Sequence, residues 1–515
     1  MRSSVHESKW FPDECRRIER SFTKLDLQIL GWDGEGQHAA IRSDGQEELD
    51  DESDMVVRKT FEAIEMKGPP PMQHPNTDNL IFMVRPCYLK LFDLIMEQAR
   101  SYENANIVVT GNPGIGKSRF YVYFIWRLTK EDLPEKYNHL VINCGQEYHV
   151  YEDKKFVQLV GEVDISRFKN IPGVLRLVDG WSDRLEGWHG TSVLFAAPGA
   201  PNMHQFEKSM TGSTFIMPPW GLEELVICNE ACGLGLSAEE IRRDFSFFGG
   251  IPRYVFSHQK KEEWRAKVER AILASGCQGF FNYVNDKSEV LDGHYSQYIL
   301  KMVPRDEDTF EDATLDFLSE QIAEKVIYEI EQQGHDKLVL FYLKALDSPD
   351  SSIFREKIYE ELCHLELTSN GQTMAARALI ENVEGPLSIS FHATSMTWFD
   401  KIEEITLVSN TAAYFRPSSK TFPSIDAIYW DGEKLYLLQM TLNTKHPIVN
   451  AAVENILEWA DSRNCCLVFV VPSRLAGAFV RQGFQASGTS KRKIEHKNLK
   501  EGVRNLPQYV IGLDP

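Results

Sequence analysis

Short apolar runs alternate with amphipathic stretches through the first half of the chain. Strands that alternate with helices at this spacing predict a parallel sheet covered by helices, which is an α/β fold. An amphipathic helix is expected at 84–100, and a second follows a glycine-rich turn at 111–118. The runs that predict buried strands are 106–110 (NIVVT), 139–143 (HLVIN), 173–180 (GVLRLVDG) and 191–197 (TSVLFAA).

Flanking segments carry less regular patterns. Residues 13–24 predict a short helix, and 215–225 (FIMPPWGLEEL) predict a strand, a proline turn and the start of a helix. Helical periodicity dominates 260–344, for example at 314–334. This region is therefore expected to form a helical lid or connector.

The last 165 residues predict a second α/β domain without another glycine-rich turn. Two of its strands are expected to form a hairpin through the turn at Asp431 and Gly432. Helices are predicted at 354–367 and 447–460, and strands at 387–393, 403–408, 424–431, 434–441 and 464–471.

Proline-rich stretches indicate the domain boundaries. Consecutive prolines at 67–75 prevent both helix and central strand, and a second boundary is expected at 346–352. The prediction is a short N-terminal region (1–78) with a solvated acidic loop at 46–54, a first α/β domain (79–345) and a second one (346–515).

The amino-acid composition limits the classes of molecule that the surface can bind. The 515 residues carry a net charge of −19, so the surface as a whole is expected to repel nucleic acids and membranes, and any such contact needs a local basic patch. The segment 490–500 (SKRKIEHKNLK) is one, and contact with phosphates, nuclear localisation and a solvated helix face all remain open. The nine cysteines show no zinc spacing, which favours reduced thiols. Neither a transmembrane span nor a secretory signal is expected.

The turn at 111–118 has the pattern G-x-x-x-x-G-K-S between a strand and a helix, which is the context that a phosphate-binding loop requires. Its glycines let backbone N–H groups approach phosphate oxygens. Lys117 is expected to reach the β- and γ-phosphates of ATP and to lie in solvent-filled space when no nucleotide is bound. The hydroxyl of Ser118 is expected to bind Mg²⁺. The predicted nucleotide-binding residues are Gly111, Asn112, Pro113, Gly114, Ile115, Gly116, Lys117, Ser118 and Arg119.

Asp179 ends the third apolar run, 62 residues after Lys117, where an acidic Mg²⁺ partner is expected opposite Ser118. An extra strand between the loop and Asp179 is typical of one subclass of phosphate-loop NTPases. Gly180 stands where many ATPases carry the glutamate that activates water, and Asp183 is a weak candidate for that base.

Arg253 is the remaining candidate of the first domain. Gly249 and Gly250 predict the end of a helix, and Pro252 prevents its continuation, so Arg253 is expected in a turn. A sensor of the γ-phosphate and a structural ion pair are both open for this arginine.

The second domain has its own group of polar residues. A helix carboxylate (Glu360), a strand carboxylate (Asp426) and Gln439 with Thr441 on the next strand match the order of metal-dependent phosphodiesterases, in which oxygen ligands hold Mg²⁺ and a lysine orients the nucleophile. Lys445 or Lys434 is the candidate cation, and Mn²⁺ is an alternative to Mg²⁺ at Glu360, Asp426 and Gln439. Two purely structural carboxylates remain the alternative.

Ordered motifs across the chain resemble those of the Crinkler effectors and the retrotransposon hot spot proteins. The motifs are TGNPGIGKS, LRLVDG, MPPWGLEEL, GGIPRYVF, YEELCH, FPSIDAIYW and LLQMTLNTKHPI. The resemblance implies a P-loop ATPase of the AAA/STAND type fused to a restriction-endonuclease-like domain. By position it also implies roles for His364 and His446 beside Glu360, Asp426, Gln439 and Thr441. The ubiquitin-like header of many Crinklers is not recognisable in residues 1–78.

Two functions follow as hypotheses. One is an ATP-gated nuclease that acts on DNA or RNA; the other is a nucleotide-dependent switch or scaffold that binds nucleic acid or a host nuclear protein without cleaving. The resemblance implies an intracellular location, in the host nucleus for a translocated effector, and leaves an oligomer open. An ABC-type ATPase is disfavoured because the chain has no LSGGQ-like signature.

Overall fold

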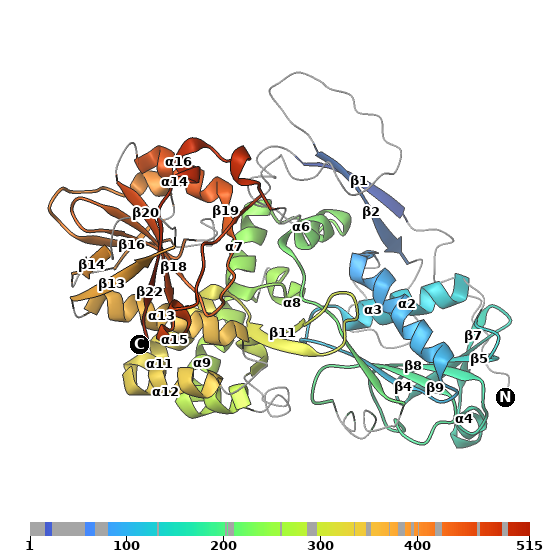
Figure 1. Cartoon of the computed structure of the whole chain (residues 1–515). Helices are drawn as coiled ribbons and strands as arrows, with labels where there is room; N and C mark the ends of the chain where they lie inside the picture. Colours follow the sequence, from blue (N-terminus) through green and yellow to red (C-terminus); the bar gives the residue numbers. More distant parts are fainter. Residues whose placement is uncertain are drawn as a thin grey trace. The chain divides into compact units, whose positions relative to one another are not determined.

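The computed structural model describes residues 16–22, 57–66, 81–130, 133–200, 203, 206, 211–257, 260–285, 296–333, 335–346, 352–369, 371–379, 387–392, 396–399, 401–417, 425–460, 464–486 and 493–515. These residues fall into two compact units, the first up to Glu329 and the second from Ile330 onwards. Each unit is built on its own β-sheet (Figure 1).

The first unit is organised around a seven-stranded sheet with the order β10-β4-β9-β8-β5-β6-β7. The first five of these strands pair in parallel, and β6 and β7 add an antiparallel edge. The four predicted strands are confirmed, and β5 is the extra strand that the chain forms between the loop and Asp179. In the sheet, β9 lies between β4 and β8. The bounds are β4 Asn106–Thr110, β5 His139–Gly145, β6 Glu147–Glu152, β7 Lys155–Leu159, β8 Val174–Ser182, β9 Thr191–Phe195 and β10 Ser213–Ile216.

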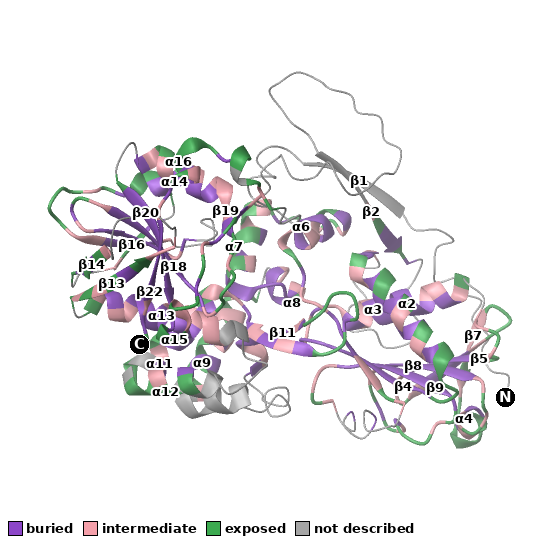
Figure 2. Cartoon of the chain, viewed as in Figure 1, coloured by how far each residue is buried: buried purple, intermediate pink, exposed green. Residues whose placement is uncertain are grey.

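Helices and loops cover both faces of this sheet. Helices α2 (Pro86–Ser101) and α3 (Lys117–Lys130) lie side by side over one face, where Phe120 and Phe124 of α3 meet Phe195 with ring centroids 5.6 and 5.7 Å apart (Figure 1). Leu194, the neighbour of Phe195 on β9, packs on the other face in a separate apolar cluster. Strands β4, β5, β8 and β9 are buried along most of their length, and α4 (Glu162–Lys169) packs near the β5–β6 edge (Figure 2).

The N-terminal residues contain strands rather than the predicted helix at 13–24. Strand β1 (Arg16–Phe22) pairs antiparallel with β2 (Val57–Glu65), and β2 pairs with β3 (Ile81–Met83). The helix prediction was wrong because cross-strand pairing along the whole of β1 overrides a weak local preference. The pairing of β2 with β3 joins residues on the two sides of the prolines at 67–75, which lie outside the described residues.

The segment after β10 follows the predicted order of strand, proline turn and helix. Helix α6 spans Leu222–Ala231, α7 spans Ala238–Phe248, and Gly249 ends α7 with a φ of +60°. Pro252 does not only stop a helix: it begins the one-turn helix α8 (Pro252–Val255), because proline suits the first helical position. Arg253 therefore lies in this short helix and not in a turn.

A β-hairpin interrupts the region that was expected to be helical. Strands β11 (Leu300–Pro304) and β12 (Ala313–Phe317) pair antiparallel, with every second residue of each strand buried. The helix predicted at 314–334 is confirmed over Glu320–Gln332. The prediction was wrong at 314–317, because the alternation of Ala313, Leu315 and Phe317 has the period of a strand. The helices here are α9 (Lys261–Asn285), the 3₁₀ turn η1 (Ser296–Tyr298) and α11 (Glu320–Gln332).

The described strands of the second unit form an eight-stranded sheet with the order β14-β13-β22-β20-β18-β17-β16-β15. The predicted hairpin is present, and β18 continues in parallel with β20. No strand forms at 403–408, where the chain makes the 3₁₀ turn η3 (Ile402–Glu404) and an irregular segment instead. The bounds are β13 Gln372–Ala378, β14 Leu387–Phe391, β15 Met396–Phe399, β16 Ala413–Pro417, β17 Ala427–Trp430, β18 Leu435–Met440, β20 Cys465–Val471 and β22 Gln508–Gly512.

Helices α12 (His335–Leu346) and α13 (Ser352–Ser369) pack together in this unit, with the rings of Tyr342 and Tyr359 5.8 Å apart. The smaller elements are β19 Ile448–Val449, α14 Asn450–Ala460, α15 Ser473–Ala476, β21 Phe484–Gln485, η4 His496–Asn498 and α16 Glu501–Arg504. Within the described part of the chain, no helix has the length and apolar character needed to cross a membrane.

Candidate functional site

The loop between β4 and α3 has a backbone that only glycine accommodates easily at three positions. Gly111, Gly114 and Gly116 have φ angles of +143°, +90° and +104°. A Cβ atom on Gly111 would lie 2.8 Å from the carbonyl oxygen of Met217, and one on Gly114 would lie 2.7 Å from Cβ of Arg253. The glycines of the motif are therefore required by the close packing around the loop as well as by its dihedral angles.

Ser118 and Asp179 meet beside this loop. Ser118 lies in the first turn of α3, Asp179 lies in β8, and the hydroxyl of Ser118 donates a 2.9 Å hydrogen bond to Oδ1 of Asp179. Burial raises the pKa of Asp179 to about 6, although the Ser118 hydroxyl and the Lys117 ammonium both lower it. A hydroxyl and a carboxylate at this separation are the hard oxygen ligands that Mg²⁺ prefers, so these residues fit the metal.

Lys117 takes a different position from the expected one. Its side chain is buried, and its ammonium donates hydrogen bonds of 2.7 and 2.9 Å to the carbonyl oxygens of Gly111 and Asn112. Burial, reinforced by the charge of Arg253, lowers the pKa of Lys117 to about 7. The expectation of a lysine in open solvent was wrong, because the loop closes on its own carbonyl groups and gives the ammonium partners there.

Two further segments hold the loop from outside. The indole Nε1 of Trp220 donates a 2.7 Å hydrogen bond to the carbonyl of Ile115, and the backbone N–H of Arg253 donates to that of Gly114 at 3.4 Å. Arg253 thus lies beside the middle of the phosphate loop. The motifs MPPWGLEEL and GGIPRYVF, distant in sequence, meet here.

Arg85 anchors this arrangement and was not singled out from the sequence. Its buried guanidinium forms a bidentate ion pair with Glu224. It also donates to the carbonyls of Pro218 and Pro219 and lies 4.6 Å from the centre of the Trp220 ring. The only signal in the sequence is an arginine before a proline at a helix start. Such a pattern does not identify a partner 139 residues away.

Other predicted residues have partners of their own. The guanidinium of Arg119 lies 5.7 Å from the ring of Phe82 on β3. Asp183, the weak candidate for a base, accepts a 2.8 Å hydrogen bond from the Tyr148 hydroxyl and pairs with Arg184. Pro113 belongs to the loop but has no side-chain donor or acceptor.

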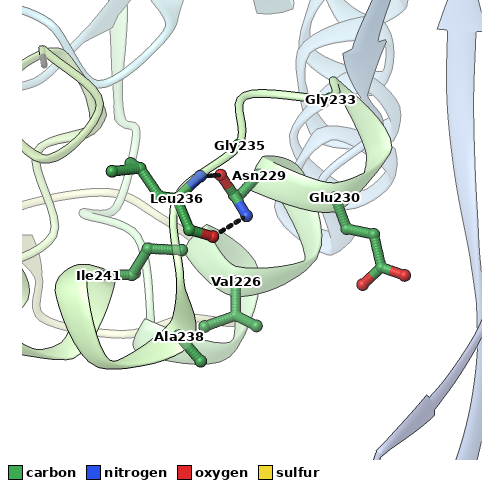
Figure 3. Close-up of a pocket in the computed structure, with 8 residues that line it drawn as sticks. All are labelled: Val226, Asn229, Glu230, Gly233, Gly235, Leu236, Ala238 and Ile241. Atoms are coloured by element: carbon green, nitrogen blue, oxygen red, sulfur yellow. Dashed lines mark hydrogen bonds between the residues drawn. The ribbon is translucent and has the colours of Figure 1, made fainter.

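A pocket of about 510 Å³ opens between α6 and α7, away from the phosphate loop (Figure 3). The amide of Asn229 is held at this pocket by Leu236, because it donates to the carbonyl of Leu236 and accepts from the N–H of Leu236 (Figure 3). The remaining lining is mostly apolar or glycine, so the pocket offers no chemistry that we assign.

In the second unit, the structure brings Asp426 and Gln439 together across the β17–β18 hairpin. The side-chain amide of Gln439 donates to Oδ2 of Asp426 at 3.1 Å, and the backbone N–H of Met440 donates to the same oxygen at 2.7 Å. Burial raises the pKa of Asp426 well above its usual value, and the charge of Glu360 raises it further. Oε1 of Gln439 is buried without a hydrogen-bond partner.

Glu360 approaches this pair from α13. Its carboxylate pairs with Lys357 at 2.9 Å and with Arg416 at 3.3 Å. Burial opposes ionisation of Glu360, but Lys357, His364 and Arg416 outweigh it and hold the pKa well below its usual range. Both Nη atoms of the Arg416 guanidinium also donate to the carboxylate of Glu361.

The predicted cations are not the ones that the structure places here. Lys445 is exposed, and Lys434 stands at the start of β18, beside the rings of Tyr436 and Tyr509, whereas Gln439 lies near the end of that strand. Lys357 occupies the expected place of the cation. It comes from α13, one turn before Glu361, whereas the two predicted lysines flank the second strand of the hairpin.

The remaining predicted residues surround this group. The buried ring of His364 hydrogen-bonds the Tyr414 hydroxyl through Nδ1 at 2.7 Å and faces Glu360 at 3.7 Å through Nε2. The hydroxyl of Thr441 donates to Glu356 at 3.1 Å. Glu356 also raises the pKa of His446, although burial dominates and lowers it.

Glu356 is a further residue that sequence reasoning missed, although its spacing contained the signal. It lies four residues before Glu360 on α13, so both carboxylates are on one face of the helix. In the described parts of the chain, no three His, Cys, Asp or Glu side chains are already arranged to hold a metal ion.

Comparison with known proteins identifies one group of relatives. Over 175 residues the chain is 29% identical to Crinkler effector proteins 15 and 16 of Phytophthora infestans, which covers 33% of this chain and 26% of each relative. The matched region thus spans about a quarter of the length of these curated relatives. The similarity to Crinkler effectors that the motifs indicated is confirmed over a third of the chain. No protein-family model matches it.

Solved structures give only distant similarity. The RuvB Holliday junction branch migration motor of Thermotoga maritima has a TM-score of 0.23 and 12% identity, covering 57% of this chain and 89% of that one. A STAND-family signal transduction ATPase with a tetratricopeptide repeat sensor, from Pyrococcus horikoshii, has a TM-score of 0.22 and 9% identity, covering 58% and 52%. Scores this low carry no argument, so the description of the first unit depends on its own strand order and loop geometry.

Proposed function

We propose that the first unit binds ATP with Mg²⁺ at the loop 111–118 and hydrolyses it. The observation that carries this proposal is the 2.9 Å hydrogen bond between Ser118 and Asp179 at the end of the glycine loop. In that loop, a Cβ atom added at Gly111 or Gly114 would clash with its neighbours. Ser118 and Asp179 come from separate elements and form a hydroxyl–carboxylate pair next to the converging backbone N–H groups. That combination supports a site for a metal-bound phosphate chain.

Each residue has a distinct role in this proposal. The loop N–H groups and the start of α3 bind phosphate oxygens, and the ammonium of Lys117 exchanges the carbonyls of Gly111 and Asn112 for the β- and γ-phosphates. Ser118 and Asp179 hold the metal, which neutralises charge on the phosphates when bound. Arg253, beside Gly114, is the candidate contact for the γ-phosphate.

Titration with a fluorescent ATP analogue tests the proposal. Lys117→Ala is expected to abolish binding, because the ammonium has no substitute in the loop. Circular dichroism and a thermal melt check that the variant folds. Equal affinity in the variant and the wild type would contradict the assignment of the loop.

We further propose that the protein acts as an effector whose nucleotide state controls the second unit. The support is the similarity to Crinkler effector proteins, which covers only a third of the chain. Delivery to host cells, a nuclear location and a nuclear protein partner are part of this proposal.

A second activity, metal-dependent cleavage of DNA or RNA, is favoured by one observation in the second unit. Oε1 of Gln439 is a buried acceptor without a donor, beside Asp426, whose carboxyl pKa is raised by burial and by the charge of Glu360. A divalent cation would give Oε1 of Gln439 a partner and would favour the ionised carboxylate of Asp426. The alternative is a binding module, in which Lys357 and Arg416 already neutralise the carboxylates.

Plasmid and RNA cleavage with Mg²⁺ or Mn²⁺, with and without ATP, separates these two functions. A nuclease loses its metal-dependent cleavage in Asp426→Ala. A binding module shows the same background in both proteins and still retains nucleic acid in a filter-binding assay.

A further inference from the structure

The phosphate loop makes one side-chain contact that the proposed nucleotide chemistry does not use. Asn112 is the second residue of the loop, and its side chain is 5% exposed. Its Nδ2 donates to the carbonyl of Leu300 at 2.7 Å, and its Oδ1 accepts from the N–H of Met302 at 2.7 Å. Both partners are backbone groups of β11, almost 190 residues further along the chain.

The pairing of the hairpin explains why β11 offers these groups. Leu318 donates its N–H to Ile299, so the hydrogen-bonded pairs of the β11–β12 ladder are at alternate positions, and Leu300 and Met302 turn their backbone groups away from β12. The amide of Asn112 binds this outer edge in the way a neighbouring strand would. The carbonyl of Leu300 and the N–H of Met302 therefore find their hydrogen-bond partner in the phosphate loop.

The same residue is also held from the inside of the loop. Its backbone carbonyl accepts one of the two hydrogen bonds of the Lys117 ammonium. When Lys117 turns to phosphate oxygens, this carbonyl keeps only the 3.4 Å hydrogen bond from the N–H of Ile115, so nucleotide binding changes how the segment that carries Asn112 is held. The side-chain amide then transmits any shift of the loop directly to Leu300 and Met302.

The far end of the hairpin is attached to the sheet independently. The N–H of Ile216 in β10 donates to the carbonyl of Phe310, and Phe215 bridges to Glu311. The base of the hairpin packs closely on the end of α7, where a Cβ on Gly249 would lie 2.0 Å from the carbonyl oxygen of Leu318. Movement at Asn112 is thus applied to a strand whose two ends are anchored.

We propose that Asn112 is a positioning residue that couples the phosphate loop to the β11–β12 hairpin, so that the hairpin responds to the nucleotide state of the loop. This inference deepens the proposed ATP-binding function and depends on it. Asn112 itself contacts no phosphate through its side chain, because both polar atoms of the amide are bound to β11.

Hydrogen–deuterium exchange of the full-length protein tests the coupling. The probe is a non-hydrolysable ATP analogue with Mg²⁺, added at a concentration that saturates each variant in its own titration. In the wild type we expect slower exchange in peptides covering 300–304 when the analogue binds, because a loop ordered by phosphate holds the amide of Asn112 against Met302. In Asn112→Ala we expect this nucleotide-dependent slowing to be lost.

Two variants isolate the contact. Met302→Pro removes the N–H from which Asn112 accepts, at a position where that N–H does not serve the β11–β12 ladder, and a thermal melt checks that the variant folds. It is also expected to lose the response. Asn106→Ala is the matched control, since Asn106 precedes the loop in β4 and its side-chain amide donates to the carbonyl of Phe206. It is expected to keep the wild-type response.

The outcomes separate this inference from the proposed function. A wild type that binds the analogue without any change at 300–304 overturns the coupling alone, as does an unchanged response in Asn112→Ala or in Met302→Pro. A folded wild type that binds no analogue overturns the proposed function and this inference with it.

Discussion

Ser118 and Asp179 lie 61 positions apart and are joined by a 2.9 Å hydrogen bond from the serine hydroxyl to the carboxylate. In the sheet, β9 lies between β4, which leads into the loop before Ser118, and β8, which carries Asp179. The bond is therefore formed above the end of β9 and not between neighbouring strands. Parallel strands that end at one edge of a sheet produce this geometry, because their carboxyl ends point the same way. The pair is therefore a consequence of strand order, and its replacement should affect chemistry more than folding.

Asp179→Asn is expected to keep ATP binding and to lose hydrolysis. The substitution removes the charge that holds the metal but leaves the loop N–H groups and Lys117 in place, so the catalytic rate should fall at least about tenfold. A phosphate-release assay under saturating ATP measures this. Asp183→Asn is the matched control, because that carboxylate is engaged by Tyr148 and Arg184. Equal rates for Asp179→Asn and the wild type would show that Asp179 is an ordinary strand residue.

The burial of Lys117 predicts a pH dependence of nucleotide affinity. Its pKa in the free protein is about 7, whereas a bound phosphate favours the charged ammonium and raises it. Between these two pKa values, binding takes up a proton, so affinity is highest below pH 7 and falls as the pH rises. The limiting slope is about tenfold per pH unit.

Calorimetry with ADP in the absence of metal checks this from pH 7.5 to 9.5. Phosphate groups lose their last proton near pH 6, so the charge of the ligand is constant in that range. Lys117→Met should bind weakly at every pH and show no slope. A wild-type affinity that is constant from pH 7.5 to 9.5 would contradict a lowered pKa for Lys117.

The sequence was sufficient for the parts of the first unit that depend on local pattern. Apolar runs of five to eight residues predicted β4, β5, β8 and β9, because each of these strands is buried on both faces and has few polar positions. The motif spacing predicted that Ser118 and Asp179 would meet. Both inferences need only the periodicity and the direction of parallel strands.

Contacts between distant segments were outside the reach of such patterns. The position of Lys117 depends on where the loop carbonyls point, and the anchor formed by Arg85 and Trp220 depends on tertiary packing. The β11–β12 hairpin was missed because its short alternation adjoins the strongly periodic helix α11. In the second unit, the contacts of Glu356 and Lys357 depend on how α13 packs on the hairpin, whereas the predicted cations, Lys434 and Lys445, flank β18 in the sequence.

The close approach of Arg253 to the loop predicts a specific effect of Gly114→Ala. The new Cβ would lie 2.7 Å from Cβ of Arg253, in a backbone with a φ of +90° that an alanine rarely adopts. Either the loop or α8 must shift, so ATP affinity should fall at least about tenfold, which corresponds to about 1.4 kcal/mol. Gly161→Ala separates the two causes, because Gly161 has a φ of +87° but no atom within 4 Å of an added Cβ.

Titration of both variants with a fluorescent ATP analogue, beside their thermal melts, measures the effect. Gly161→Ala should lose some stability and keep wild-type affinity. If both variants bind ATP equally well, contact between Arg253 and the loop does not shape the nucleotide site.

The last prediction concerns the group of Glu360, Asp426 and Gln439. A divalent cation bound there competes with protonation of Asp426, whose pKa burial and Glu360 raise, and it gives the orphan Oε1 of Gln439 a partner. Metal affinity should therefore rise with pH, because a raised pKa means that protons compete with the metal until Asp426 ionises. Mn²⁺ is expected to bind before Mg²⁺, since one ligand is a neutral amide oxygen.

Calorimetry of the full-length protein with Mn²⁺, without nucleotide, decides the question. Runs in two buffers of different ionisation enthalpy reveal the released proton. Asp426→Asn should lose both the binding and the proton release, while Glu433→Ala, an exposed carboxylate on the same hairpin, should keep both. Identical isotherms for wild type and Asp426→Asn would mean that Lys357 and Arg416 are the permanent counter-ions of these carboxylates, and the second unit would then act by binding and not by cleavage.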